Sequence, residues 1–259
     1  MPRSFPLRRI SNRMRAPERD PLTSLAYEAG GSGSPLILLH GLSGSGRWWG
    51  RNVPAFASRF RTYAVDLPGF GESRRVRWSR LDDTVDRLAD WIAAEGLARA
   101  HVAGHSLGGA VAARLAARHP ERVDRLVLVA AAIRPEGKRP GPRAADIVQT
   151  VRSGVPGFAP MLVRDLLRCH PWSFMAATVD AVQPDWESHL TRINAPTLVV
   201  WGAHDAITPM ALGRDIVESV ADAQLLVLPN AGHTPMWECA EAFNAEVLRF
   251  LTATDDTDT

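Results

Sequence analysis

The segment Gly104–Gly108, with the sequence Gly-His-Ser-Leu-Gly, constrains the fold of this chain more than any other. An apolar run ends just before it at Ala103, and an alanine-rich segment with helical spacing follows it and ends before Pro120. A serine between two glycines at such a junction predicts a sharp strand-turn-helix that exposes the hydroxyl of Ser106. Such a turn lets a base reach the oxygen from one side and a substrate from the other.

The rest of the sequence predicts the α/β fold class. Short apolar runs alternate with helical patterns, which is typical of parallel strands joined by crossovers, with helices on both faces of the sheet. The predicted strands are 22–28, 35–40, 61–66, 99–104, 125–131, 196–202 and 224–229, and the predicted helices are 80–95, 109–118, 210–220 and 239–252. We therefore expect a core formed by residues 21–132 and 191–252.

Residues 133–190 interrupt this alternation. They are rich in Pro and Gly, hold two or three short helical pieces, and carry several large apolar side chains. We interpret them as a helical cap, a lid whose apolar face shapes a substrate pocket. The alternative is a pair of helices that only covers an edge of the sheet.

The composition favours a soluble globular enzyme. Of the 259 residues, 46% are hydrophobic and 22% are charged, and no apolar run is long enough to span a membrane. The formal net charge of +2 does not favour nucleic acid as a partner. The two cysteines, Cys169 and Cys239, lack metal-ligand spacing and are too few for a disulfide framework, which predicts packed thiols in a reducing, cytoplasmic compartment.

Both ends of the chain are expected to be flexible. Residues 1–20 are rich in arginine and contain prolines, and they lack the apolar stretch of a signal peptide. Their Arg-rich, acid-poor start resembles a transit peptide, but the prolines interrupt any amphipathic helix. A flexible extension or a start at Met14 explains them equally well. Residues 253–259, rich in Thr and Asp, are expected to form a solvated tail.

A nucleophilic serine needs a base and an orienting acid, and this chain supplies them in the order Ser, acid, His. Asp205 follows the predicted strand 196–202, and His233 follows the predicted strand 224–229. The carboxyl ends of parallel strands meet at one edge of a sheet, where ligands bind. We therefore predict that Ser106, Asp205 and His233 form a catalytic triad.

Other residues of the same types lie near strand ends and offer alternatives. The other histidines that border predicted strands are His40, His101, His105 and His204, and the weaker candidates for the acid are Asp66 and Glu136. Each of these histidines is explained as well by packing or by a satisfied structural hydrogen bond. His233 itself could be structural, and Asp205 could simply cap a turn.

An acyl-transfer site also needs amides that stabilise a negative oxygen. The amide after the nucleophile belongs to Leu107, and we expect the second from Leu42, in the glycine- and serine-rich turn at residues 40–46. Ser43 is the alternative for the second donor. The same turn lacks both the Lys-Ser/Thr end of a P-loop and the spacing of a dinucleotide fingerprint, so we do not expect it to bind a nucleotide.

Several further motifs carry a family resemblance. They are His40-Gly41, Trp48-Trp49, the run Asp66-Leu67-Pro68-Gly69-Phe70-Gly71-Glu72-Ser73, the pentapeptide at 104–108, Trp201-Gly202-Ala203-His204-Asp205, and Gly232-His233. Over residues 22–251 the chain resembles the α/β-hydrolase fold superfamily, in its small esterase and haloperoxidase-like branch. The resemblance implies an eight-stranded, mostly parallel sheet flanked by helices, with a small helical cap inserted after the sixth strand. It also implies a Ser106–His233–Asp205 triad with no cofactor and no metal, and a structural role for residues 66–73.

This scaffold also resembles enzymes with other chemistries. Dehalogenases and epoxide hydrolases use an aspartate in place of Ser106, and carbon-carbon hydrolases of ring-cleavage pathways usually have Asn where this chain has His105. We expect a carboxylesterase-type serine hydrolase acting on the ester or thioester of a fairly apolar small molecule. Perhydrolase or haloperoxidase-like chemistry, carbon-carbon hydrolysis, and a ligand receptor on a hydrolase scaffold remain open alternatives.

The predicted substrate contacts are apolar and aromatic side chains, although any of them could belong to the core. They are Trp49, Phe158, Met161, Trp172, Met210 and Trp237. The expected partner is a small acyl ester, with no nucleic acid and no membrane span, and the chain is expected to be a monomer or a homodimer.

Overall fold

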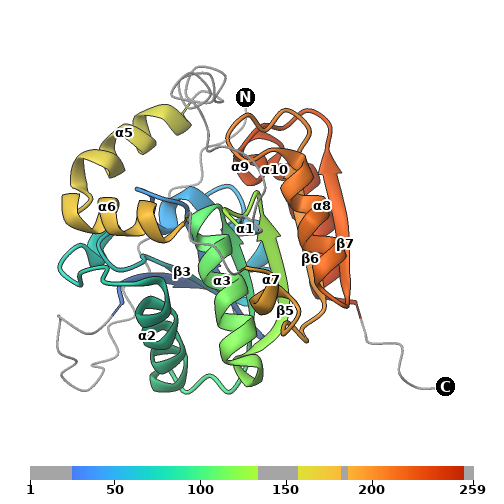
Figure 1. Ribbon diagram of the computed structural model, residues 1–259, viewed down its shortest axis with the longest axis horizontal. Coiled ribbons are helices and arrows are strands. Elements are labelled where there is room, and N and C mark those ends of the chain that lie inside the picture. The colour runs from blue at the N-terminus through green and yellow to red at the C-terminus, as the bar shows by residue number, and fades with distance from the viewer. Residues whose placement is uncertain (1–24, 134–156, 182–185, 254–259) are drawn as a thin grey trace.

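The computed structural model describes residues 25–133, 157–181 and 186–253, and a seven-stranded sheet forms its centre (Figure 1). The strands are β1 (Tyr27–Gly30), β2 (Pro35–Leu39), β3 (Arg61–Val65), β4 (Ala100–His105), β5 (Val123–Val129), β6 (Thr197–Gly202) and β7 (Ala223–Leu228). Their order is β1-β3-β2-β4-β5-β6-β7. Only β1 is antiparallel to its neighbour, so the sheet is mostly parallel.

The predicted fold class is confirmed, with one difference in the strand count. Each of the seven strands predicted from the sequence pattern has a counterpart, but the described residues contain no eighth strand. The cap therefore follows the fifth strand of this sheet and not the sixth. The eighth strand was implied by the family resemblance alone, and the described residues have no further apolar run of strand type to form it.

The helices agree with the predicted ones to within two residues at each end, and several shorter ones appear as well. They are η1 (Gly46–Trp49), α1 (Val53–Phe56), η2 (Gly71–Ser73), α2 (Leu81–Ala94), α3 (Leu107–Arg118), η3 (Pro120–Arg122), α5 (Phe158–Arg168), α6 (Pro171–Asp180), α7 (Glu187–Leu190), α8 (Met210–Ser219), α9 (Pro235–Glu238) and α10 (Ala240–Leu251). Helices α2, α3 and α8 contribute to the core on one face of the sheet, and α1, α9 and α10 to the core on the other. None of the helices in the described ranges has the length and apolar character needed to cross a membrane.

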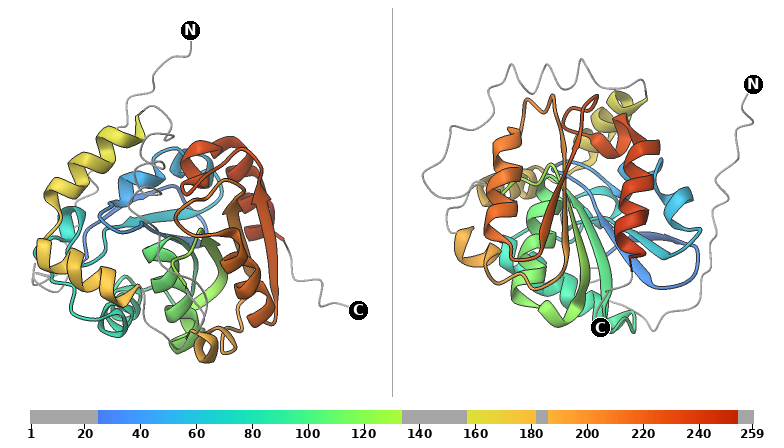
Figure 2. Two further views of the ribbon diagram at one scale, coloured as in Figure 1. Left: turned by 45° about the horizontal axis from the view of Figure 1, so that its top comes forward. Right: turned by 90° about the vertical axis from the view of Figure 1, so that its right-hand side faces the viewer.

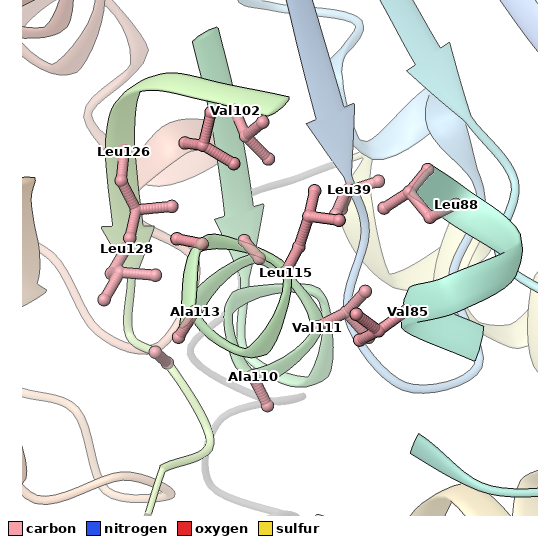
Figure 3. Close-up of a cluster of buried hydrophobic side chains, with 14 of the residues drawn as sticks. Leu39, Val85, Leu88, Val102, Ala110, Val111, Ala113, Leu115, Leu126 and Leu128 are labelled. Atoms are coloured by element: carbon pink, nitrogen blue, oxygen red, sulfur yellow. The ribbon is translucent and has the colours of Figure 1, made fainter. Parts of the chain in front are cut away.

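Helix α3 is almost entirely buried between the sheet and α2, as Figure 3 shows for its side chains. The small side chain of Ala113 lies toward Leu128 of β5, while Val111 and Leu115 lie toward Val85 and Leu39. Gly109 lies so close to Ala131 that an added Cβ would be only 2.7 Å from the Ala131 Cβ atom. This tight packing fixes the start of α3, which directly follows Ser106.

Helices α5 and α6 lie together at one side of the molecule (Figure 2). Two buried carboxylates tie them to the core. The Asp165 Oδ2 atom accepts hydrogen bonds from the Ser45 hydroxyl at 2.7 Å and from the Trp48 indole N–H at 3.1 Å. The Asp180 Oδ2 atom accepts one from the Trp78 indole N–H at 2.7 Å. A buried indole N–H needs such an acceptor, so these contacts fix α5 to the loop after β2 and α6 to the loop after β3.

The predicted segment boundaries need one correction. Helix α7 falls within the predicted cap at 133–190, but it packs against α3 and α8. Its flanking residues Trp186 and Leu190 are fully buried in the same core cluster as α3. These residues therefore belong to the core, because their apolar side chains are buried there. The predicted extension 1–20, Glu136, and all of the predicted tail except Ala253 lie outside the described residues.

Candidate active site

Ser106 lies on a sharp turn between β4 and α3, as the sequence pattern predicts. Its backbone has φ 52° and ψ −114°, a conformation that side-chain-bearing residues rarely adopt. Hydrogen bonds hold the turn: the Ser106 amide donates to the Val129 carbonyl at 2.9 Å, and the Ala132 amide donates to the Ser106 carbonyl at 2.9 Å. Backbone strain of this kind costs on the order of 1–3 kcal/mol and concentrates at functional sites.

The two glycines of the pentapeptide make the turn sterically possible. A Cβ at Gly104 would lie 2.2 Å from the Gly108 carbonyl oxygen, and one at Gly108 would lie 2.5 Å from the carbonyl oxygens of Leu39 and His40. No side chain fits at either position, because the nearest atoms belong to the backbone. The glycines therefore allow the nucleophile turn to sit directly against the end of β2.

The side chains of Ser106, His233 and Asp205 form one line of hydrogen bonds. The Ser106 Oγ atom lies 3.2 Å from His233 Nε2, and His233 Nδ1 lies 2.9 Å from Asp205 Oδ2. Asp205 follows β6 and His233 follows β7, so three strand ends of the sheet bring these groups together. The arrangement can transfer the serine proton to the imidazole and stabilise the resulting positive charge.

Asp205 is held in place by the turn that follows it. Its Oδ1 atom accepts hydrogen bonds from the amides of Ile207 and Thr208, each at 2.9 Å, and its Oδ2 atom accepts one from the Thr208 hydroxyl at 2.6 Å. Burial alone would raise the pKa of Asp205. The charge of His233 and the hydrogen bonds from His233 and Thr208 outweigh burial, so the pKa lies below its usual value and the carboxylate is ionised.

The two amides predicted for the oxyanion hole are those of Leu107, directly after Ser106, and of Leu42, in the turn after β2. Leu107 is the first residue of α3, where amides have no partner within the helix. Leu42 lies in the turn after β2, which Ser43 makes possible by adopting φ 63°. Within the ranges that the structure describes, neither amide donates a hydrogen bond. Both residues predicted for the oxyanion hole therefore keep an unused donor.

His40 and His105 are buried structural residues beside the triad. His40 Nε2 accepts a hydrogen bond from the Leu67 amide at 2.9 Å, so its Nδ1–H donates to the Gly41 carbonyl at 2.8 Å. His105 Nε2 lies 2.8 Å from the carbonyl oxygen of His233 and donates to it. Burial, together with the nearby charge of His233, lowers the pKa of His105 to about 3. A neutral His105 thus fixes the backbone that carries the imidazole of His233.

This buried histidine predicts a loss of stability in acid. The unfolded chain binds a proton at His105 below about pH 6.5, whereas the folded chain does so only near pH 3. The stabilisation is complete above the unfolded pKa and is lost as the pH falls toward the folded pKa. We expect His105→Gln, which keeps an N–H donor but does not titrate, to flatten the dependence of the unfolding free energy by about 1.4 kcal/mol per pH unit in this window.

Urea unfolding at several pH values between 6 and 4 measures this slope. His204→Gln is the matched control, because His204 is exposed and should leave the slope unchanged. An equal slope for the wild type and His105→Gln would contradict the assignment of a buried neutral imidazole.

The remaining alternatives named from the sequence have structural contacts of their own. Asp66 accepts hydrogen bonds from the amides of Gly46 and Glu72, each at 2.7 Å, and so joins two loops. His101 is buried against Phe60, and burial lowers its pKa. Neither residue is in contact with the triad.

Three of the six predicted substrate contacts lie in the same part of the structure. Phe158, Met161 and Trp237 meet between the cap and the core, where Phe158 lies 4.9 Å from Trp48 and 5.4 Å from Trp237 between ring centroids. Met210 packs at the start of α8 against the other core cluster.

Trp49 and Trp172 do not join this aromatic cluster. Trp49 is fully buried against Phe243 because its ring turns into the core, while its neighbour Trp48 faces the cap. Trp172 is 61% exposed on the surface of α6, where no described residue covers it. The structure therefore places these two side chains away from the predicted pocket.

Two residues near the site were missed by sequence reasoning. The Thr208 Oγ1 atom lies 3.2 Å from His233 Nδ1 and donates a hydrogen bond to Asp205 Oδ2. The one signal for Thr208 in the sequence was its position three residues after the acid. Asp165 contacts a loop that lies 120 residues away in the sequence, so no local pattern could have revealed it.

A mostly parallel sheet with a serine on a strained turn after its central strand defines the class of α/β-hydrolase folds. The chain belongs to the alpha/beta hydrolase family, whose profile matches residues 36–246. The resemblance seen in the sequence motifs is thereby confirmed.

The relatives that are named as hydrolases or esterases support hydrolase activity, and the relatives differ in what they act on. The chain is 36% identical over 251 residues to the dihydrolipoyllysine-residue acetyltransferase component of an acetoin cleaving system from Pseudomonas putida, covering 87% of this chain but only 65% of that relative. It is 33% identical to a 2-hydroxy-6-oxononadienedioate/2-hydroxy-6-oxononatrienedioate hydrolase from Burkholderia vietnamiensis, covering 87% and 90% of the two chains. It is also 33% identical to a pimeloyl-[acyl-carrier protein] methyl ester esterase from Chromobacterium violaceum, covering 82% and 92%. Among solved structures, a thermophilic esterase from Thermogutta terrifontis shares 27% identity with a TM-score of 0.77, covering 88% and 92%.

Proposed function

We propose that this protein is a serine hydrolase that cleaves a carboxylic ester or thioester of a fairly apolar small molecule through an acyl-enzyme intermediate. The observation that carries the proposal is the unbroken line from Ser106 through His233 to Asp205, with distances of 3.2 and 2.9 Å. A serine, an imidazole and a buried carboxylate in this order constitute the machinery of acyl transfer.

In the proposed mechanism, His233 Nε2 takes the proton of Ser106 as the serine oxygen attacks the substrate carbonyl carbon. The Nδ1–H group of His233 points to Asp205, which stabilises the imidazolium. The Leu42 and Leu107 amides donate to the oxygen that becomes negative in the tetrahedral intermediate. His233 then protonates the leaving alcohol or thiol, and a water molecule activated by the same imidazole releases the acid.

The aromatic cluster between the cap and the core supports an apolar acyl group. Trp48 lies 5.8 Å from His105, and His105 lies 4.9 Å from His233 between ring centroids, so the cluster of Trp48, Phe158 and Trp237 adjoins the catalytic histidine. The esterases among the relatives and solved structures favour an ester as the scissile group.

Carbon-carbon bond hydrolysis is the second candidate. It is favoured by the 33% identity to the hydrolase from Burkholderia vietnamiensis that acts on 2-hydroxy-6-oxo dienoic acids. Against it, His105 precedes the serine here, in the position where the family resemblance implies Asn for such enzymes.

A titration with a fluorophosphonate, followed by assays on 4-nitrophenyl esters of increasing chain length, tests the proposal. We expect stoichiometric labelling at Ser106 and rapid turnover of at least one ester. Labelling with turnover only of a 2-hydroxy-6-oxo dienoate would favour the second candidate. Labelling without turnover of either substrate would favour a ligand receptor, and the absence of labelling would rule out the serine mechanism.

A further inference from the structure

Helices α5 and α6 expose most of the large apolar side chains on the surface of the described residues. They are Val163, Leu166 and Leu167 on α5, and Trp172, Met175 and Val179 on α6, joined elsewhere only by Tyr27. Leu167 is 81% exposed and Trp172 is 61% exposed. The spacing of three and four residues places each set along one side of its helix. The cap therefore presents an apolar surface that the described residues leave uncovered.

Arginines border this apolar surface. One shallow hollow is lined by Ala159, Pro160, Val163, Arg164, Leu167 and Arg168, and a second by Arg74, Arg75, Arg77, Arg168, Cys169, His170 and Pro171. Arg168 lines both hollows, so they lie on either side of one side chain. We call this combined region, with the exposed side chains of α6, the cap surface.

Much of the positive charge on the cap surface is not neutralised. Glu72 pairs with Arg168 at 2.7 Å and with Arg74 at 3.2 Å. Arg75, Arg77 and Arg164 are exposed and form no ion pair within the described parts of the chain. The guanidinium group of Arg164 thus shares a hollow with the exposed side chains of Val163 and Leu167.

We propose that the cap surface docks on an anionic lipid bilayer. Exposed Leu167, Trp172 and Met175 would enter the interfacial layer, where tryptophan is favoured because its ring is both apolar and polar. Arg75, Arg77 and Arg164 would contact the phosphate groups of the lipid heads. The chemistry of the surface matches a layer that is negatively charged outside and apolar beneath.

Charge also selects the bilayer over a second copy of this chain. A two-fold dimer through the cap surface would face the same arginines of two copies toward each other, with Glu72 already engaged. A purely acidic protein surface would neutralise the arginines but would leave the six exposed apolar side chains without an apolar partner. An anionic bilayer would neutralise the arginines and would also bury the apolar side chains.

The position of α5 connects this surface to the active site. Phe158 at the start of the helix contacts Trp48 and Trp237, while Leu167 lies near its far end. Docking would therefore place one end of α5 in the lipid and the other at the aromatic cluster. An apolar substrate could then pass from the lipid to the aromatic cluster. This delivery of substrate rests on the proposed function, whereas the docking itself does not.

Co-sedimentation of the full chain with phosphatidylglycerol or phosphatidylcholine vesicles tests the docking. We expect binding to phosphatidylglycerol that weakens as salt is added, and at least about tenfold weaker binding to phosphatidylcholine. Arg75→Glu/Arg77→Glu should weaken binding to phosphatidylglycerol by at least about tenfold. Trp172→Ala/Met175→Ala should also weaken it. Because the chain has eight tryptophans, the shift of emission to shorter wavelength on binding should be seen in the wild type and be lost in the variant that lacks Trp172.

Arg192→Glu/Arg214→Glu is the matched control. It changes the net charge equally, but both arginines are exposed away from the cap, Arg192 after α7 and Arg214 on α8 (Figure 1). This variant should bind nearly as the wild type does. Equal binding to both lipids, no vesicle binding, or equal weakening by both arginine pairs would overturn the proposal. Binding of poly-glutamate without binding of vesicles would overturn it in favour of an acidic protein partner.

Discussion

Replacing Ser106 by alanine should lower kcat for ester hydrolysis by about 10⁵- to 10⁶-fold, because the acyl-enzyme can no longer form. The residual rate would come from the Leu42 and Leu107 amides and from substrate binding. Steady-state kinetics on the best 4-nitrophenyl ester measure the loss, and fluorophosphonate labelling should disappear with it. Ser58→Ala is the matched control, since its exposed hydroxyl only donates to the Ala55 carbonyl.

A Ser106→Ala variant that keeps its structure and retains activity within about tenfold of the wild type would contradict a covalent serine mechanism. Circular dichroism and the unfolding midpoint establish that the structure is kept. The substitution should be well tolerated, because it removes a single hydroxyl and leaves both flanking glycines in place.

Asp205→Asn should lower kcat by about 10⁴-fold while leaving the fold intact. The Asp205 side chain is fully buried and accepts the His233 Nδ1–H at 2.9 Å. An amide at this position can donate to Nδ1 and favour the wrong imidazole tautomer, and it cannot stabilise the imidazolium. Asp222→Asn, at an exposed position before β7, is the matched control.

The pH dependence of kcat distinguishes this effect from simple misfolding. If hydroxide replaces the lost base, the activity of Asp205→Asn should rise with pH, whereas a destabilised protein would lose its activity at every pH. An Asp205→Asn variant that matches the wild type in kcat would show that another group orients His233.

The strands and long helices could be predicted from the sequence because each has its own periodic pattern. The central strands are apolar throughout, as Leu36–Leu39 and Leu126–Val129 show, and α2 and α10 have helical spacing. The meeting of Ser106, Asp205 and His233 could be predicted as well, because the carboxyl ends of parallel strands share one edge.

Contacts between distant segments could not be predicted in the same way. Trp48 and Trp49 are adjacent, yet one faces the cap and the other the core, and only the path of η1 decides which. The role of Trp186 in the core depends on the position of α7 against α3, which no local pattern specifies. Side chains in the cap were the hardest to place, because apolar residues there lie both at the site and on the outer surface.

The carboxylate of Asp165 has a consequence for engineering and evolution of the enzyme. It joins α5 to Ser45 and Trp48, in the same loop that carries the Leu42 amide. We therefore expect substitutions that reshape α5 to displace the Leu42 amide, the proposed oxyanion donor, unless this carboxylate is kept. A change in α5 is therefore expected to alter the range of substrates and the turnover rate together. A library that varies α5 should hold Asp165, Ser45 and Trp48 constant.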